Sequence, residues 1–401
     1  METCEHREHQ TFDRRRLAIL QRVCTGYRAS LFRRLTAEGN WQVRMFIGAD
    51  LPFSKVRSAS DLSGLDVVRL PTQWIRIGRR GWAVHRGLVA ALERYQPDAI
   101  LCEGESNMLS GLAALRYRMR YKHVGVVHWS LGGLPGAVVR PGSVRGRLKY
   151  LFQRSFDGFV VYSSFGKDML LRLGHSAERI FVATNVSDTQ MHLSCAREMT
   201  ESRSQARAKL GLPDGFTVLY VGALDENKRL EHLLLAAEDL PPDSVNVVVV
   251  GDGPMMPRLR QLAEARGLTS VQMPGRVTRE LPLYYRASDV FVLPGRGGMV
   301  ISEAMAHALP VIVYQADGTE YDLVRHRETG LHLQRGDVRA LRDAITLCRG
   351  NPRQAAAWGR AGQKLVAERF TQDHMVCRIL EALDAACTRR TRHRMLDDSA
   401  S

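Results

Sequence analysis

The chain has 401 residues, 57 Lys and Arg against 42 Asp and Glu, and a formal net charge of +15. This length exceeds the usual range of a single domain, so we expect two domains of about 200 residues. The apolar runs, such as residues 247–250, fall far short of the roughly 20 residues that span a bilayer, and METCEHREHQ at the start lacks the apolar core of a signal peptide. Seven cysteines without any C-x-x-C pair argue against a disulfide framework. We therefore expect a cytoplasmic protein.

Apolar segments alternate with helical patterns along the chain, which predicts parallel sheets covered on both faces and hence the α/β class. The expected strands of the first half are residues 16–20, 43–48, 66–70, 99–103, 124–128, 158–162 and 180–184. Those of the second half are residues 217–222, 245–251, 270–274, 289–294, 310–314 and 330–333. The expected organisation is an N-terminal domain at 1–188, a linker at 189–213, a second domain at 214–370, and a C-terminal segment at 371–401 that ends in a frayed basic tail.

Nearly all of the excess positive charge lies in the first half. Residues 1–190 contain 29 Lys or Arg and 16 Asp or Glu, a balance of +13. The basic residues gather at Arg76, Arg79 and Arg80 and on two predicted helices, at 116–122 and 145–149. Such helices can lie against an anionic membrane surface, where each basic residue contributes about 1 kcal/mol. Solvated surface arginines are the alternative. No nucleic acid partner is expected, because no motif of a nucleic-acid-binding fold accompanies the charge.

The segment 289–330 predicts a phosphate site. A buried strand leads into a glycine turn at Gly295, Gly297 and Gly298, then into a helix that carries Glu303, then into a second buried strand. Glycines at the carboxyl end of a parallel strand let backbone amides approach an anion, and the next helix adds its positive N-terminal end. Glu303 is placed to accept hydrogen bonds from a ribose diol. A plain turn with a solvated glutamate is the alternative.

This segment resembles the nucleotide-sugar half of the retaining glycosyltransferases of family 4, which have the GT-B architecture of two facing Rossmann-like domains. Residues 303–312, EAMAHALPVI, closely match the family's E-A-M-A-x-G-x-P-V-I line, with Ala308 where glycine is usual. The family's first glutamate, commonly beside the donor sugar, is replaced by Gly295. The resemblance is strong over 217–333, moderate over 120–188 and at the C-terminus, and weak elsewhere.

The resemblance implies how the second domain binds its donor. Residues 221–237 are similar to the family's V-G-R-L-x-x-x-K-G line, with Ala223 in place of the arginine. Lys228 would neutralise the diphosphate on which charge builds as it leaves, and Arg229 would supply the missing guanidinium. A dinucleotide fingerprint is absent, because Met256 stands where its third glycine would be. The implied donor-binding residues are Gly222, Lys228, Arg229, Arg276, Val277, Gly297, Gly298, Met299 and Glu303.

The first domain matches the family more loosely. Tyr27 and Arg28 lie where members of the family face the interdomain cleft. His128 ends a predicted strand where many members contact the donor sugar, although a single histidine at a strand end is more often a core or turn residue. Glu103 and Glu105 are candidates to replace the carboxylate that Gly295 lacks. Residues 368–383 look like the terminal helix that returns to the first domain.

The resemblance implies a retaining transfer of a sugar from a nucleoside-diphosphate donor to a saccharide or a polyprenyl- or lipid-linked acceptor. The catalytic residues would be His128, Lys228 and Glu303, without a bound metal or other cofactor. The expected role is surface polysaccharide or glycolipid synthesis, in the cytoplasm or on the inner face of the cell membrane. The alternatives are a non-catalytic GT-B descendant and a basic peripheral membrane-binding protein. The sugar, the base and the linkage stay open.

Overall fold

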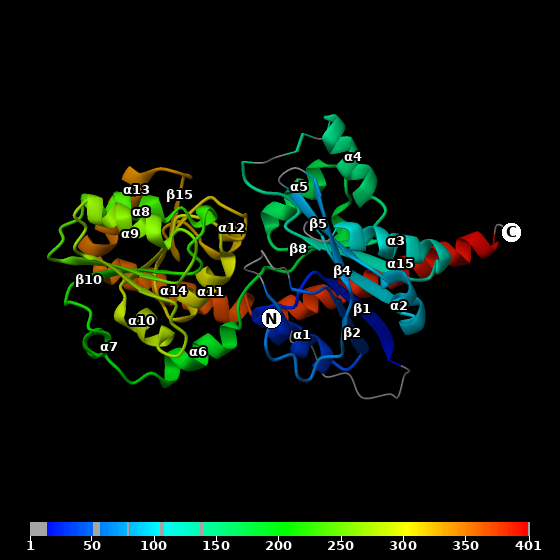
Figure 1. Cartoon of the computed structure of the whole chain (residues 1–401), viewed down its shortest axis with the longest axis horizontal. Helices are drawn as coiled ribbons and strands as arrows, with labels where there is room; N and C mark the ends of the chain where they lie inside the picture. Colours follow the sequence, from blue (N-terminus) through cyan, green and yellow to red (C-terminus); the bar gives the residue numbers. More distant parts are fainter. Residues whose placement is uncertain are drawn as a thin grey trace. The chain divides into compact units, whose positions relative to one another are not determined.

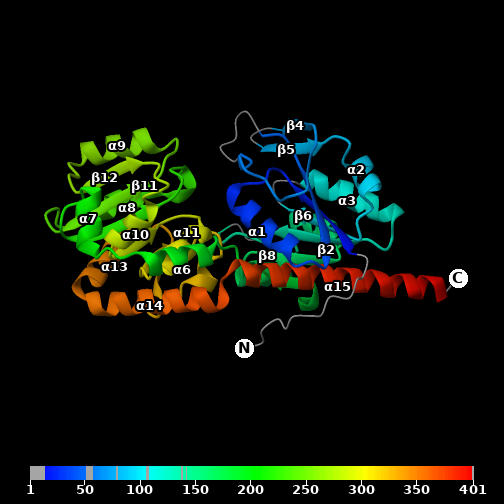
Figure 2. The same ribbon diagram turned by 90° about the horizontal axis from the view of Figure 1, so that it is seen from below.

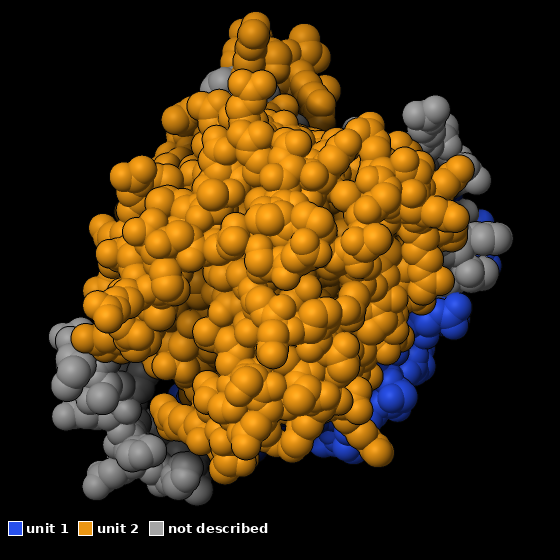
Figure 3. All heavy atoms as spheres, turned by 90° about the vertical axis from the view of Figure 1, so that its left-hand side faces the viewer, with its two compact units in different colours: residues 1–129, 155–158, 383–401 blue, residues 130–154, 159–382 orange. Residues whose placement is uncertain are grey.

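The computed structural model describes residues 14–50, 57–77, 80–104, 108–136, 139–140 and 142–399. The chain divides into two compact units, which Figure 3 colours separately. Unit 1 contains residues 1–129, 155–158 and 383–401, and unit 2 contains residues 130–154 and 159–382. This division differs from the expected domains at 1–188 and 214–370, because most of 130–188 groups with unit 2.

The strands form two large sheets and one hairpin. The first sheet has the order β3-β2-β1-β6-β7-β8-β9. Its strands are β1 (Arg15–Gln21), β2 (Trp41–Ile47), β3 (Val67–Arg69), β6 (Ala99–Glu103), β7 (Gly125–Ser130), β8 (Gly158–Val161) and β9 (Ile180–Val182). The helices among them are α1 (Gly26–Ala37), α2 (Leu88–Tyr95), α3 (Met108–Arg120), α4 (Val144–Gln153) and α5 (Ser164–Arg172). The seven strands expected in the first half are thus all present.

The antiparallel hairpin of β4 (Thr72–Ile77) and β5 (Arg80–His85) is not among the expected strands. Its sequence signal is the enrichment in aromatic and β-branched residues, such as Trp74, Ile75 and Trp82. Arg76 and Arg80 belong to this hairpin, and their side chains are outside the described part of the structure, as is the whole of Arg79.

The second sheet is entirely parallel, in the order β12-β11-β10-β13-β14-β15. Its strands are β10 (Phe216–Val221), β11 (Val245–Val250), β12 (Val271–Gly275), β13 (Val290–Leu293), β14 (Val311–Tyr314) and β15 (Gly330–Leu333). All six strands expected in the second half are present. Strand β10 has its successor β11 on one side and β13 on the other, so the chain reverses its direction of winding between β10 and β13. In open α/β sheets, ligands bind beyond the carboxyl ends of the strands at such a point.

Helices cover both faces of this sheet. Figure 1 shows α8 (Leu230–Glu238), α9 (Met256–Ala265) and α13 (Val338–Gly350) on one face, with α10 (Leu281–Ala287) and α11 (Gly298–Ala306) on the other. The remaining elements are α6 (Thr189–Glu198), α7 (Arg203–Leu210), α12 (Glu320–Leu323), α14 (Pro352–Arg369), α15 (Gln372–Ser399) and the short 3-10 helices η1 (Ala177–Arg179) and η2 (Glu226–Lys228). Buried residues of β10, β11, β13 and β14 form the core between the two helical layers.

The expected linker at 189–213 is largely helical. It forms α6 and α7, and α7 begins with a capping box in which Ser202 and Gln205 satisfy each other's backbone amides. Arg207 of α7 then pairs with Asp289. The polar composition that suggests a linker therefore belongs to two surface helices of unit 2.

The expectation of a frayed C-terminal tail is wrong. Helix α15, drawn in red in Figure 2, continues through the basic residues to Ser399. Within unit 1, Arg390 pairs with Asp157, and Arg389 donates a hydrogen bond of 3.0 Å to the Asp157 carbonyl oxygen. These contacts order the tail, because each gives an arginine a partially buried partner. Among the helices that the structure describes, none is both long and apolar enough to cross a membrane.

Candidate functional site

Three loops of unit 2 meet at the carboxyl edge of the second sheet. They follow the adjacent strands β10, β13 and β14, and they contain Lys228, the glycine turn 295–298 and Asp317. The amide of Arg296 donates to the Asn227 carbonyl oxygen at 3.1 Å, which joins the first two loops. The amide of Gly297 donates to Asp317 Oδ2 at 3.0 Å, which joins the second and third. The topology therefore assembles one site from segments about 90 residues apart in the sequence.

The glycine turn is wedged between its two neighbours. A Cβ atom on Gly295 would lie 2.1 Å from the Asn227 carbonyl oxygen, and one on Gly298 would lie 2.4 Å from Thr319 Cγ2. Gly297 has a φ of +151°, which residues with a side chain rarely adopt. All three glycines are therefore required by packing or by backbone conformation. Within this packing, a side chain at position 295 would collide with the 227–228 backbone.

Lys228 lies directly against this turn. Its ammonium group donates a hydrogen bond to the Arg296 carbonyl oxygen, and it lies 2.8 Å from where a Cβ of Gly297 would be. Burial lowers the pKa of Lys228, while Asp225 and Asp317 oppose that shift. A half-buried cation beside glycine amides is suited to bind an anion. The structure thus brings Lys228, Gly297 and Gly298 together.

Arg229 adds positive charge to the same edge. Its backbone is left-handed, with a φ of 53°, and this conformation separates the 3-10 helix η2 from α8. The pKa of Arg229 is lowered mainly by burial, and the positive charges of Arg335 and Arg296 lower it further. None of these three guanidinium groups forms an ion pair within the described residues. Three such arginines within electrostatic range of one another favour the binding of an anion.

Asp317, like Arg296 and Arg335, is not among the site residues that the sequence predicts. Asp317 follows β14 in the segment 315–319, and its Oδ1 also accepts the amide of Thr319 at 3.1 Å. Glu320 holds this loop in shape, because its carboxylate accepts the backbone amides of Ala316 and Gly318 at 2.6 and 2.9 Å. The available signal was the Asp-Gly pair at 317–318, which is typical of a tight turn. Glu320 is accordingly structural.

Glu303 lies in a separate, largely buried cluster. Its side chain is 17% exposed, and Oε2 accepts the Tyr285 hydroxyl at 2.9 Å and lies 4.0 Å from His192 Nε2. Burial raises the pKa of Glu303 to about 7, and the Tyr285 hydrogen bond opposes that rise. The ring of His307 stacks on Tyr285 and its Nε2 lies 3.4 Å from His192 Nδ1. The described contacts of Glu303 are thus with side chains of its own unit.

The remaining expected donor residues occupy different places on the edge. Gly222 follows β10, and its amide donates to the Val250 carbonyl oxygen. Met299 is in the first turn of α11, which begins without a side-chain cap. Arg276 is exposed just after the edge strand β12, whereas Val277 packs partly against the core.

In unit 1, Tyr27 and Arg28 open helix α1. The guanidinium of Arg28 lies 3.8 Å from the ring centre of Trp129 and 5.4 Å from that of Tyr27. His128, beside Trp129 on β7, instead packs edge-on against Phe156, with ring centres 4.8 Å apart. Since successive strand residues point to opposite faces, His128 lies on the sheet face opposite to Arg28. The structure does not bring these two residues together.

Glu103 and Glu105 are the two candidates to replace the carboxylate that Gly295 lacks. Glu103 ends β6, and its Oε2 accepts the amide of Arg22 at 2.9 Å, which joins the ends of the neighbouring strands β1 and β6. Glu105 lies outside the described residues. Over the ranges that the structure describes, no cluster of three or more His, Cys, Asp or Glu side chains is arranged to hold a metal ion.

Two family models match the chain. The model of Glycosyltransferase Family 4 matches residues 27–190, and the model described as Glycosyl transferases group 1 matches residues 202–365. The second match contains all three loops of the site.

Curated relatives match parts of the chain. The chain is 27% identical over 272 residues to the alpha-monoglucosyldiacylglycerol synthase of Streptococcus pneumoniae. This alignment covers 62% of this chain and 59% of that protein. The chain is 30% identical over 196 residues to the GDP-mannose-dependent alpha-(1-6)-phosphatidylinositol monomannoside mannosyltransferase of Mycobacterium tuberculosis, covering 45% and 51%. The chain thus matches between half and three-fifths of the length of these relatives.

Solved structures share the fold over almost the whole chain. Anabaena HepE in complex with UDP matches with a TM-score of 0.73 at 19% identity, covering 92% of this chain and 100% of that one. Sucrose-phosphate synthase from Thermosynechococcus elongatus matches with a TM-score of 0.68 at 23% identity, covering 97% and 100%. At these identities the likeness establishes the fold alone.

Proposed function

Because the chain belongs to the family 4-type glycosyltransferases with the GT-B fold, we propose that it transfers a sugar from a nucleoside-diphosphate donor to a glycan or lipid-linked acceptor with retention. The observation that carries this proposal is the position of Lys228 against the glycine turn, where β10 and β13 lie side by side. That is where an α/β sheet binds a phosphorylated ligand.

The proposed chemistry centres on the leaving nucleoside diphosphate. Negative charge grows on its phosphate oxygens as the bond to the sugar breaks, so a cation fixed beside them stabilises the transition state more than the ground state. Lys228 and Arg229 supply the cations, and the N-terminal amides of Gly298 and Met299 point along the dipole of α11. In retention, the acceptor hydroxyl attacks from the face that the diphosphate leaves, which the resemblance to family 4 supports.

The names of the relatives support a class of acceptor. The names of two of them include diacylglycerol and phosphatidylinositol. These names support a glycolipid or polysaccharide precursor as the proposed acceptor class. The proposed location is the cytoplasm, with peripheral membrane contact. No metal or other cofactor enters the proposed reaction.

The first test is calorimetric binding of UDP, GDP and ADP to the full chain. One of them should bind the wild type, and Lys228→Ala should weaken that affinity at least about tenfold, because it removes a charged hydrogen-bond donor. Lys364→Ala is the matched control, since Lys364 is exposed on α14. Failure of all three nucleotides to bind the wild type would overturn the proposed donor site.

The second test follows transfer itself. Incubation with the sugar conjugate of the bound nucleotide and a lipid acceptor should form a product whose anomeric configuration, read by NMR, equals that of the donor. An inverted configuration would contradict retention while leaving the transferase proposal intact. Nucleotide binding without transfer to any lipid or glycan acceptor would favour the non-catalytic GT-B descendant.

A further inference from the structure

A long stretch of the sequence contains basic residues but no acidic ones. Between Glu105 and Asp157 there are nine Lys or Arg and not one Asp or Glu. Part of this stretch forms α3 in unit 1, and part forms α4 in unit 2. The two helices differ in what their charged side chains contact.

On α3, two of the arginines are already paired with acids. Arg118 lies 3.3 Å from Asp157 Oδ2 in a largely buried pair, and Arg120 lies 3.3 Å from Glu93. Their charges are therefore partly neutralised within the unit. By sequence alone, the basic segments 116–122 and 145–149 look equally available to a ligand. In the structure, part of the positive charge of 116–122 is used in ion pairs within unit 1.

Helix α4 exposes an apolar stripe. Val144, Leu148 and Leu151 are 76%, 63% and 52% exposed. Their spacing of four and three residues places them on one face of the helix. The opposite face carries the buried Gly146 and Gln153, so the orientation of α4 on unit 2 leaves the apolar stripe outward. The exposure of three large aliphatic side chains along one face of a helix is unfavourable in water and marks an interaction surface.

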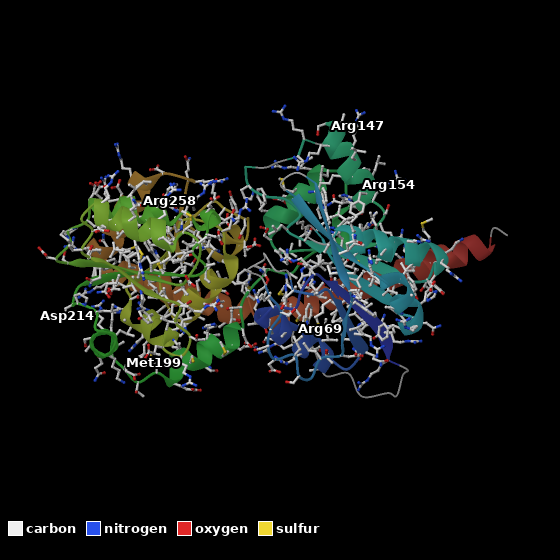
Figure 4. All side chains as sticks on the ribbon, viewed as in Figure 1. Arg69, Arg147, Arg154, Met199, Asp214 and Arg258 are labelled. Atoms are coloured by element: carbon white, nitrogen blue, oxygen red, sulfur yellow. The ribbon has the colours of Figure 1, made fainter. Side chains whose placement is uncertain are left out.

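Arginines flank this stripe. Helical geometry places Arg147 and Arg154 along one side of it and Arg145 along the other. All three are exposed, and Figure 4 labels Arg147 on α4 and Arg154 directly after it. None of the three forms an ion pair with any carboxylate in the described part of the chain. Lys149 differs, since its ammonium group donates to the Gly132 carbonyl oxygen at 3.1 Å.

We propose that α4 docks unit 2 on an anionic phospholipid surface, with Val144, Leu148 and Leu151 in the acyl boundary and the arginines on the lipid phosphates. An apolar stripe bordered by cations is the arrangement of a helix that lies in a membrane interface. The charge selects an anionic lipid surface as the occupant, because a purely apolar partner would leave the arginines uncompensated. This inference concerns where the enzyme works and depends on α4, not on the donor site.

The test is sedimentation of the full chain with vesicles of phosphatidylcholine that contain about 30% phosphatidylglycerol. Binding should be strong at low salt and at least about tenfold weaker with pure phosphatidylcholine. Arg147→Gln with Arg154→Gln should weaken it by about twenty-five-fold, since each arginine contributes about fivefold. Leu148→Gln with Leu151→Gln should weaken it by at least about tenfold through loss of apolar burial.

Matched controls come from elsewhere in unit 2. Arg349 and Arg353 are exposed and lack ion pairs in the described structure, and Leu347 is an exposed leucine on α13. Substituting these by Gln should leave vesicle binding unchanged. Leu148→Trp provides a direct readout, because its fluorescence should shift to the blue with anionic vesicles, whereas that of Leu347→Trp should not.

Three results would overturn the proposal: no binding of the wild type to anionic vesicles, equal binding to neutral ones, or unchanged binding by both double variants. A wild-type dimer that dissociates in Leu148→Gln with Leu151→Gln would instead assign the stripe to a second copy of the chain. Lys228→Ala should bind vesicles like the wild type, so loss of the donor site and loss of membrane binding are separately observable.

Discussion

The amide of Gly297 donates its hydrogen bond to Oδ2 of Asp317, so a carboxylate lies at the backbone position where a donor phosphate is expected. Asp317 is also close enough to Lys228 to oppose the lowering of its pKa. One short carboxylate thus acts on both the amide and the cation of the proposed diphosphate site.

Asp317→Asn should strengthen the binding of the free nucleoside diphosphate. The amide oxygen of Asn can keep the hydrogen bond from Gly297, while the negative charge that repels the phosphates is removed. The gain should be about 1 kcal/mol, or roughly fivefold in affinity, for a charge near the protein surface. Calorimetry with the nucleotide that the wild type binds measures it. Asp243→Asn, at an exposed turn, is the control, and an unchanged affinity of Asp317→Asn would place Asp317 away from the diphosphate.

Gly295→Ala should destabilise unit 2 by about 2 kcal/mol or more, because its Cβ would lie 2.1 Å from one backbone atom and 2.5 Å from Lys228 Cα. Gly295→Glu, which restores the family's residue, should be at least as disruptive. Urea unfolding gives the free energies. Gly350→Ala is the control, since nothing lies within 4 Å of its Cβ position and it ends α13, so alanine should be neutral or slightly stabilising. Equal stability of Gly295→Ala and the wild type would contradict the wedged turn.

Glu303→Gln should change the pH dependence of stability. Burial raises the pKa of Glu303 from 4.5 to about 7, so in that window the folded protein retains a proton that the unfolded chain has lost. Through Glu303, stability therefore falls as pH rises, by up to about 1.4 kcal/mol per pH unit. The variant lacks this loss, so its melting temperature relative to the wild type should rise from about pH 4.5 to about pH 7 and level off above that.

The control for this measurement is Glu368→Gln, on an exposed carboxylate of α14, for which the difference should stay flat. His192 and His307, whose pKa values burial lowers to about 4 and about 3, are present in both proteins. A difference for Glu303→Gln that falls with pH would refute the buried carboxyl. The nucleotide affinity of the same variant tests the proposed ribose contact separately.

Asp157→Asn should destabilise unit 1 by about 3 kcal/mol, because losing its charge leaves two partly buried guanidinium groups uncompensated, which costs more than the pair itself contributed. Asp157 pairs with Arg118 and Arg390 and accepts the amide of Val126 at 2.8 Å. Thermal unfolding measures the effect. Glu381→Gln removes an exposed pair with Arg378 and should cost less than about 0.5 kcal/mol. Equal small effects would mean that the tail of α15 is not held by Asp157.

The sequence by itself determined the strands of the two large sheets and the glycine turn at 295–298. These features are local: a run of apolar residues specifies a buried strand, and a glycine permits a backbone that approaches its neighbours closely. Lys228 lies eight residues after Tyr220 of β10. Because strands and helices alternate along the chain, this position just after a strand predicts that Lys228 lies at the edge of the sheet.

The tertiary structure decided which of the candidate residues share a site. Asp317 reaches Gly297 only because β13 and β14 are neighbours in the sheet, which no local pattern reveals. The sequence places both His128 and Arg28 at the edge of the first domain, yet the alternation of side chains along β7 puts them on opposite faces. Glu303 has the residue type of a ribose ligand, but its burial beside Tyr285 depends on how α10 packs near α11.

The same distinction holds for the charges. Composition shows that residues 106–156 are basic, and it shows this equally for α3 and α4. Only the fold places Asp157 beside Arg118 and leaves Arg147 and Leu148 facing outward, because burial and pairing depend on what lies across from a side chain. Local sequence therefore determined the elements and the turn, whereas contacts between distant segments decided which charges are neutralised and which remain available to a ligand.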